Sequence, residues 1–176
     1  GKYEASRDDR LVEALIERGV FQRGAEHASV NFALEGGGIE TDGAGTLLTT
    51  WRCMHERHPE ATRESLSANL AGWLAQRRVL WLEHGYLEGD DTDAHIDTLA
   101  RFAAEDAIVY QSCDDVSDTH YNELQAMAAE LVVRRGAALF EAGRDCGAEA
   151  NIGKMLAADA AWKAGEACLQ TFGGFG

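Results

Sequence analysis

The order of short apolar segments restricts the fold of this chain more than any other feature of its sequence. Apolar and polar residues alternate at 29–34, and a second apolar run at 46–50 follows a glycine-containing turn. A segment with helical periodicity begins at Thr62 and runs to about Arg77, and short apolar runs follow at 79–82 and 108–111. Short strands with a helix between them form one repeating unit of a layered α/β fold, so we expect the α/β class.

Three further segments have the residue spacing of helices. Residues 6–19 begin with an S-x-x-D capping pattern and end at a glycine, residues 120–131 carry a regular apolar stripe, and residues 149–171 are rich in alanine. The helical pattern of the second segment continues past Leu131 to about Ala142. The C-terminal part of the chain is therefore predicted to be all-α.

The charge of the chain excludes one class of partner and favours another. The formal net charge is −14, and residues 1–131 carry all of the excess, with 11 Lys/Arg against 25 Asp/Glu. Residues 132–176 carry five of each sign. Nucleic acid would be repelled, whereas a cationic ligand would be attracted. No apolar run is long enough for a membrane span and no signal-peptide pattern opens the chain, so a cytoplasmic location is expected.

The stretch from Gly89 to Asp97 gathers charge in a way that suggests a site. Its ionisable residues are Asp90, Asp91, Asp93, His95 and Asp97. Crowded carboxylates repel one another unless a cation meets them, and an imidazole beside a carboxylate is a common acid/base arrangement. In an extended segment, residues two apart project to the same face, which would place His95 beside Asp97. A solvated acidic surface loop is the alternative interpretation.

A second segment strengthens the site interpretation. The alternating run 29–34 is predicted to be a strand, and it ends at Glu35, which is followed directly by three glycines. A carboxylate at the end of a strand and before a flexible turn is placed to reach into a cleft.

These two segments together resemble the agmatine deiminase family of guanidine-modifying enzymes, which includes the bacterial peptidylarginine deiminases. The matching sequences are LEGG at 34–37, DGAGTLLTT at 42–50 and GDDTDAHID at 89–97. The resemblance implies a five-bladed α/β propeller, of which this chain would hold about two blades, followed by the all-α segment.

The resemblance also implies a chemistry. In this family a cysteine thiolate attacks the guanidinium carbon, ammonia leaves, and water releases a ureido product. For agmatine, a precursor in polyamine biosynthesis, that product is N-carbamoylputrescine. By motif, Glu35 and His95 would be the acid/base pair, and Asp97, with Asp93, would bind the small guanidinium substrate; no cofactor is implied. The family's nucleophile lies in a late glycine-rich motif that is missing here, so we expect the chain to be inactive alone.

The C-terminal segment resembles a different family. The sequences CGAEAN at 146–151 and ACLQTFGGFG at 167–176 resemble the C-terminal helical domain of the acyl-CoA dehydrogenases. That resemblance implies a flavin (FAD) contact at Gln170, Gly173 and Gly174. Without it, the same residues would be interpreted as a plain helix with a glycine-rich end.

Two partial genes joined in one frame would explain both resemblances. We therefore expect deiminase-like sequence at 1–131 and dehydrogenase-like sequence at 132–176. The competing functions are a deiminase-type hydrolase, a flavin-binding module, and a non-catalytic chimeric fragment that binds guanidinium cations. The sequence leaves the oligomeric state open.

The cysteines and histidines give no metal site. The pattern C-x-H-x-x-H at Cys53, His55 and His58 lacks the glutamate of H-E-x-x-H and a fourth ligand. None of the four cysteines belongs to a C-x-x-C pair, so reduced thiols are expected.

Overall fold

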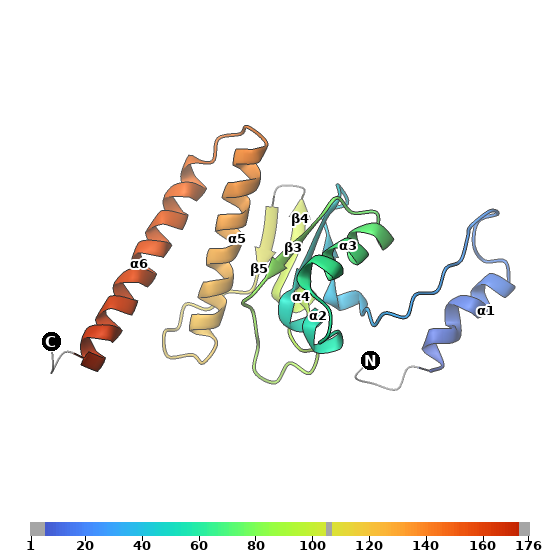
Figure 1. The fold of residues 1–176 in the computed structure, drawn as a ribbon, viewed down its shortest axis with the longest axis horizontal. Helices are drawn as coiled ribbons and strands as arrows, with labels where there is room; N and C mark the ends of the chain where they lie inside the picture. Colours follow the sequence, from blue (N-terminus) through green and yellow to red (C-terminus); the bar gives the residue numbers. More distant parts are fainter. Residues whose placement is uncertain (1–5, 105–106, 173–176) are drawn as a thin grey trace.

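The computed structural model of this chain describes residues 6–104 and 107–172. Its central strand is β2 (Thr46–Thr50), all of whose residues are buried. Strand β1 (Glu40–Thr41) pairs with β2 in antiparallel orientation, and β3 (Arg78–Leu82) pairs with it in parallel. The sheet order is therefore β1-β2-β3 (Figure 1).

Two helices connect the parallel strands and cover one face of the sheet. They are α2 (Trp51–Arg57) and α3 (Arg63–Trp73). Each begins at a threonine whose hydroxyl accepts a backbone hydrogen bond: Thr50 from Cys53 N at 3.2 Å and Thr62 from Ser65 N at 3.2 Å. The buried cluster between these helices and the sheet consists of Leu47, Cys53, Met54, Leu66, Leu70 and Trp81.

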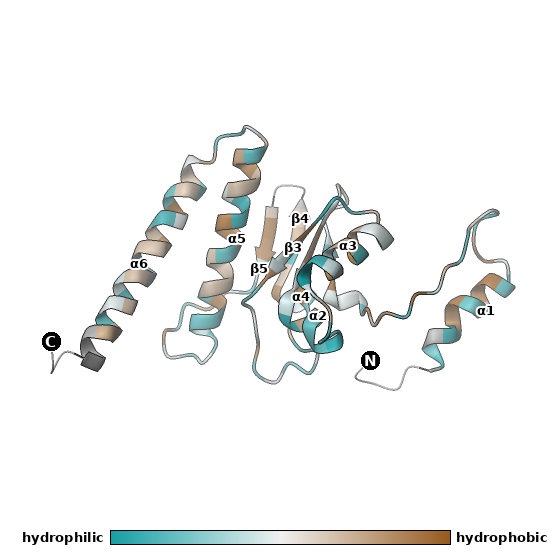
Figure 2. Ribbon diagram, in the orientation of Figure 1, coloured by the Kyte–Doolittle hydropathy of each residue, from teal (hydrophilic) through white to brown (hydrophobic). Residues whose placement is uncertain are grey.

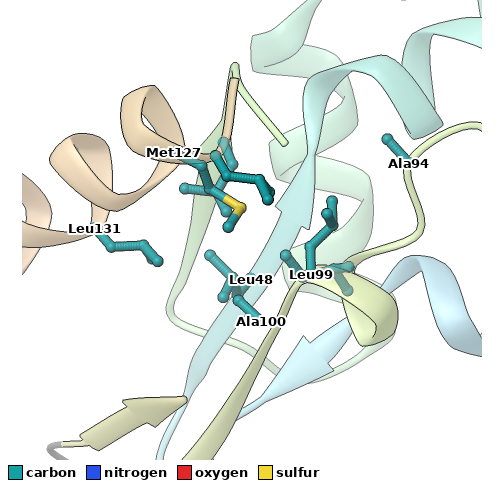
Figure 3. Close-up of a cluster of buried hydrophobic side chains, with 9 residues drawn as sticks. Leu48, Ala94, Leu99, Ala100, Met127 and Leu131 are labelled. Carbon is teal, nitrogen blue, oxygen red and sulfur yellow. The ribbon is translucent and has the colours of Figure 1, made fainter. Parts of the chain in front are cut away.

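The opposite face of the sheet is covered by α4 (Ile96–Leu99) and α5 (Tyr121–Glu141). Figure 3 shows Met127 and Leu131 of α5 directed toward Leu48 of β2 and Leu99 of α4. The full cluster consists of Leu48, Leu82, Ala94, Ile96, Leu99, Ala100, Leu124, Met127 and Leu131. Hydrophobic residues are concentrated on the strands between the two helical layers (Figure 2).

The remaining elements lie at the edges. Strands β4 (Ala100–Ala104) and β5 (Ala107–Tyr110) form an antiparallel pair. A 3₁₀ helix (Asp8–Arg10) and α1 (Leu11–Glu17) stand apart from the sheet at the N-terminal side (Figure 1). Helix α6 (Gly147–Phe172) lies beside α5. None of the helices formed by the described residues combines the length and apolar character that crossing a bilayer requires.

Several predicted elements are confirmed. The run 46–50 is β2, the run 79–82 is β3 with one more residue, and 108–111 corresponds to β5. The helix capped by Thr62 ends at Trp73 and not near Arg77, because Ala75 adopts a positive φ of 53°, which is incompatible with a continuing α-helix. The α/β class is thus confirmed, and the described residues form two small open sheets and no closed one.

One prediction about secondary structure is wrong, and another is confirmed only in part. Residues 29–34 form no strand; the alternating side chains are instead used in packing, with Phe32 stacked on His58 at 3.8 Å between ring centroids. The predicted helix at 6–19 is split into the 3₁₀ helix and α1, which ends at Glu17. The predicted change of sequence type at Leu131 falls inside α5, which continues through it without a break.

Candidate active site

Glu35 lies in extended backbone immediately before a 3₁₀ turn formed by Gly36–Gly38. Contacts on both sides fix this position. The carbonyl of Ala33 is 2.8 Å from His58 Nε2, and the Thr49 hydroxyl of β2 donates to the Gly38 carbonyl at 2.7 Å. The glutamate is therefore delivered by an irregular segment fastened to α2 and β2, and not by the strand that the alternation predicted.

His95 is placed by a tight turn that Asp90 organises. The Asp90 carboxylate accepts hydrogen bonds from Thr92 N at 2.9 Å and from Ala94 N at 2.8 Å. Within this turn Asp93 and Ala94 have positive φ angles of 61° and 67°, which side chains rarely adopt. The Thr50 hydroxyl then donates to the Ala94 carbonyl at 2.7 Å and attaches the turn to the end of β2.

The turn leads directly into helix α4, so the extended arrangement predicted for 95–97 is wrong. His95 is the N-terminal cap residue of α4 and Asp97 lies in its first turn. The two side chains nevertheless both lie against Gly37. A Cβ added at Gly37 would be 2.6 Å from His95 Nδ1 and 2.7 Å from Asp97 Oδ2. Only a residue without a side chain fits there.

The structure brings Glu35 and His95 together across 60 residues of sequence, with His95 Nε2 2.6 Å from Glu35 Oε2. Burial alone would raise the pKa of the Glu35 carboxyl, but hydrogen bonds and charges from Arg57 and His95 outweigh it and hold that pKa below its ordinary value. Because an ionised carboxylate only accepts, Nε2 of His95 carries the shared proton. The other ring nitrogen, Nδ1, faces Gly37 on the side where Asp97 Oδ2 also lies.

Sequence reasoning missed one member of this site, Arg57. Its guanidinium is ion-paired with Glu35, and its Nη1 lies 3.9 Å from Asp93 Oδ2. The Asp93 carboxylate is thus directed toward Arg57. No local signal identifies Arg57, because it is the last residue of α2 and its partners are distant in sequence.

The cysteines and the C-x-H-x-x-H pattern are not assembled into a site. The described residues contain no cluster of three or more potential metal ligands. Cys53 is fully buried, and burial raises the pKa of its thiol to about 11. His58 contacts the Ala33 carbonyl, and His55 stacks on the Trp51 ring at 4.8 Å.

Of the three residues predicted to contact a flavin, Gly173 and Gly174 lie outside the described residues. Gln170 lies within α6, but its side chain is also outside the described part.

Two family models match parts of this chain. The family model for the Porphyromonas-type peptidyl-arginine deiminases matches residues 1–138, which include every residue of the Glu35–His95 site. The chain belongs to this deiminase family. A second family model, for the C-terminal domain of acyl-CoA dehydrogenases, matches residues 122–176. The two matches overlap at 122–138, within α5.

Several similar proteins are agmatine deiminases, and a solved structure described as a putative arginine deiminase from Porphyromonas gingivalis superposes with a TM-score of 0.69 at 46% identity, covering 74% of this chain and 39% of that one. The chain is 36% identical over 133 residues to agmatine deiminase of Stutzerimonas stutzeri and 34% identical over 134 residues to that of Pseudomonas fluorescens. These matches cover 74% and 75% of this chain and 35% of each relative. A solved structure of C. jejuni agmatine deiminase, a cysteine-to-serine variant with substrate bound, superposes with a TM-score of 0.67 at 35% identity, covering 74% of this chain and 39% of that one. The chain thus spans about a third of the length of the curated relatives that it matches.

Proposed function

We propose that this chain carries the acid/base and guanidinium-binding part of an agmatine deiminase-type site. The observation that carries the proposal is the 2.6 Å contact between Glu35 and His95, with Asp97 converging on the same glycine. The ligand would be a small guanidinium cation such as agmatine, the substrate in the names of the relatives. Carboxylates suit a planar guanidinium, whose N–H groups all donate.

The geometry suggests a role for each residue. Glu35 holds the Nε2 proton of His95 and so leaves Nδ1 available to accept or return a proton. In deimination, His95 would protonate the departing ammonia and then activate water for release of the ureido product. Asp97 would accept N–H donors of the substrate, while Asp93 would act through Arg57.

Isothermal titration calorimetry with agmatine tests this proposal on the full chain, with circular dichroism to verify folding. We expect saturable binding that is weakened about tenfold or more in His95→Ala, which removes the imidazole that aligns Glu35, and in Asp97→Asn, which removes a negative charge opposite the cation. The matched controls are His27→Ala and Asp114→Asn, which alter exposed residues of the same types and should leave the affinity unchanged. A folded chain that does not bind agmatine would contradict the proposal.

Full deimination needs a nucleophile that the described cysteines do not supply. Cys53 is buried beneath the site with a raised pKa. Cys113 lies in the loop after β5, Cys146 lies directly before α6, and Cys168 lies within α6. We therefore infer that these 176 residues bind a guanidinium but do not turn it over by themselves. Formation of N-carbamoylputrescine from agmatine by the purified chain would contradict this.

The finer architecture belongs to the same proposal. The unit of β1, β2, the two connecting helices and β3 would be one blade of an α/β propeller, with part of a second blade beside it and the all-α segment after it. We also propose a cytoplasmic location and a chain in which sequences of two families are joined near Leu131. Sequencing of the source locus that revealed one uninterrupted deiminase gene would contradict the joined-gene proposal.

A flavin-binding module is the second candidate function, and the match of 122–176 to the acyl-CoA dehydrogenase domain favours it. Among the described residues of α6, no contact indicates a flavin site. We therefore propose no catalytic step for this candidate. The purified chain would show visible flavin absorbance if this candidate were correct, and a colourless folded chain that stays colourless with added FAD would contradict it.

A further inference from the structure

We infer that Arg57 is the positioning residue of this site: it holds Glu35 ionised and aligned with His95, and it fixes the turn that presents His95. The inference rests on the proposed function, because it assigns a role to Arg57 within the same guanidinium site. Its basis is the set of contacts that a single side chain makes with both halves of the site.

The guanidinium joins two segments that are distant in sequence. Nη2 is ion-paired with Glu35 Oε2 and donates to the Thr92 carbonyl at 3.2 Å. Nη1 donates to the Cys53 carbonyl at 2.9 Å, one helical turn back along α2. Arg57 is thus attached at once to its own helix, to the segment before the glycine turn and to the turn that precedes His95.

Burial makes these contacts significant. The Arg57 side chain is only 6% exposed, compared with 34% for Glu35. Among the described residues its Nε is buried without a hydrogen-bond partner, so the Nη groups make all of its polar contacts. A nearly buried cation requires an anion close by, and Glu35 and Asp93 provide it.

The arrangement also determines which glutamate oxygen is left for a ligand. Arg57 and His95 both meet Oε2 of Glu35. Within the part of the chain that the structure describes, Oε1 accepts no hydrogen bond. Arg57 therefore fixes the carboxylate with one oxygen on His95 and the other available to an incoming N–H donor.

Lysine cannot reproduce this geometry. A guanidinium presents donors in a planar fork that reaches a carboxylate and two carbonyls together, whereas an ammonium is a compact point charge. Arg57→Lys keeps the charge and loses the fork, and Arg57→Gln loses both. Comparison of the two separates the effect of charge on Glu35 from the effect of alignment.

The test is a pH titration of the Glu35 side-chain carboxyl by ¹³C NMR in the full chain, with agmatine affinity measured over the same pH range. In Arg57→Gln the midpoint of the Glu35 titration should move to higher pH. Burial raises the pKa of this carboxyl, and the hydrogen bond and charge of Arg57, which lower it, are then missing. The pH below which agmatine binding is lost should rise with it. Arg57→Lys should lie between the wild type and Arg57→Gln.

Arg52→Gln is the matched control. Arg52 lies on the same helix, is exposed, and packs its guanidinium over the Tyr86 ring at 4.1 Å. This variant should titrate and bind as the wild type does. An unchanged Glu35 midpoint in folded Arg57→Gln and Arg57→Lys chains would overturn the inference.

Two further outcomes remain decisive. If neither Arg57 variant folds, NMR of the wild-type chain decides. Nη protons of Arg57 that are held by hydrogen bonds should give slowly exchanging signals, which should vanish as Glu35 is protonated. Rapidly averaged Nη signals would overturn the inference. If the wild-type chain binds no agmatine, the proposed function fails while the Glu35 titration still decides the role of Arg57.

Discussion

Gly37 is the residue at which the site tolerates no side chain. A Cβ there would lie within 3 Å of His95 Nδ1 and of Asp97 Oδ2, so both groups would have to move. We expect Gly37→Ala to destabilise the fold by about 1–3 kcal/mol, the usual range for overpacking, and to abolish agmatine binding. Urea unfolding and calorimetry measure the two effects.

The control for that change is its neighbour. A Cβ at Gly36 meets no atom within 4 Å, so Gly36→Ala should leave both stability and binding close to those of the wild type. Equal effects of the two substitutions would show that flexibility of the glycine turn matters and that close approach at Gly37 does not.

Asp90 makes the stability of the His95 turn depend on pH. Burial opposes its ionisation, but hydrogen bonds from Thr92 and Ala94 outweigh burial and hold the pKa of the carboxyl below its ordinary value. The stabilisation is therefore present above the unfolded-state pKa and lost as the pH falls through the folded-state pKa. In Asp90→Asn the amide nitrogen cannot accept the Ala94 N–H, and we expect a loss of roughly 1–3 kcal/mol at neutral pH.

Urea unfolding over a pH series checks this prediction. The difference in unfolding free energy between wild type and Asp90→Asn should shrink in acid. A difference that is constant down to the acid limit would mean that the negative charge of Asp90 is not what holds the turn.

The site residues were predictable only in part. The sequence indicates Glu35 by the three glycines after it, and His95 and Asp97 by the acidic stretch that holds them and by their motif; the structure brings all three together. Arg57 was missed because it is one of many arginines on helices, and only the folded chain shows that its side chain is buried.

Thr50 joins three elements through one hydroxyl. It ends β2, accepts from Cys53 N to begin α2, and donates to the Ala94 carbonyl before α4. Thr50→Val leaves two buried backbone groups unpaired, so we expect it to destabilise the chain by about 1–3 kcal/mol. Thr50→Ser keeps the hydroxyl and should lose less, as measured by urea unfolding; equal losses would assign the effect to packing of the methyl group.

The local sequence pattern predicts some strands correctly and others wrongly. The β2 and β3 runs are short and rich in β-branched or apolar residues; β2 is buried throughout and β3 at its C-terminal end, and the sequence indicates both without knowledge of their partners. The alternation at 29–34 is equally clear, yet a strand also requires a neighbour with which to pair. Among the described residues none pairs with this segment, and Phe32 packs instead on His58, the residue after α2, and on Trp73 of α3.

The parts of the whole molecule differ in how strongly they are held. The sheet is covered on both faces, whereas α6 lies against α5 and leaves Met155 62% and Trp162 70% exposed. We expect amide hydrogens of α6 to exchange much faster than those of β2 and β3, since few buried contacts oppose its opening. Hydrogen-exchange mass spectrometry measures this, and equal protection would show that α6 unfolds only with the sheet.

Helix α5 has a consequence for how such a chain can arise. A helix repeats the same backbone step at every residue, so two sequences of different descent can meet inside it without a turn, a gap or a strained bond. The two family matches overlap within α5, where Leu124, Met127 and Leu131 keep their inward spacing. If two sequences are joined here, as proposed above, the join leaves no mark on the backbone of α5.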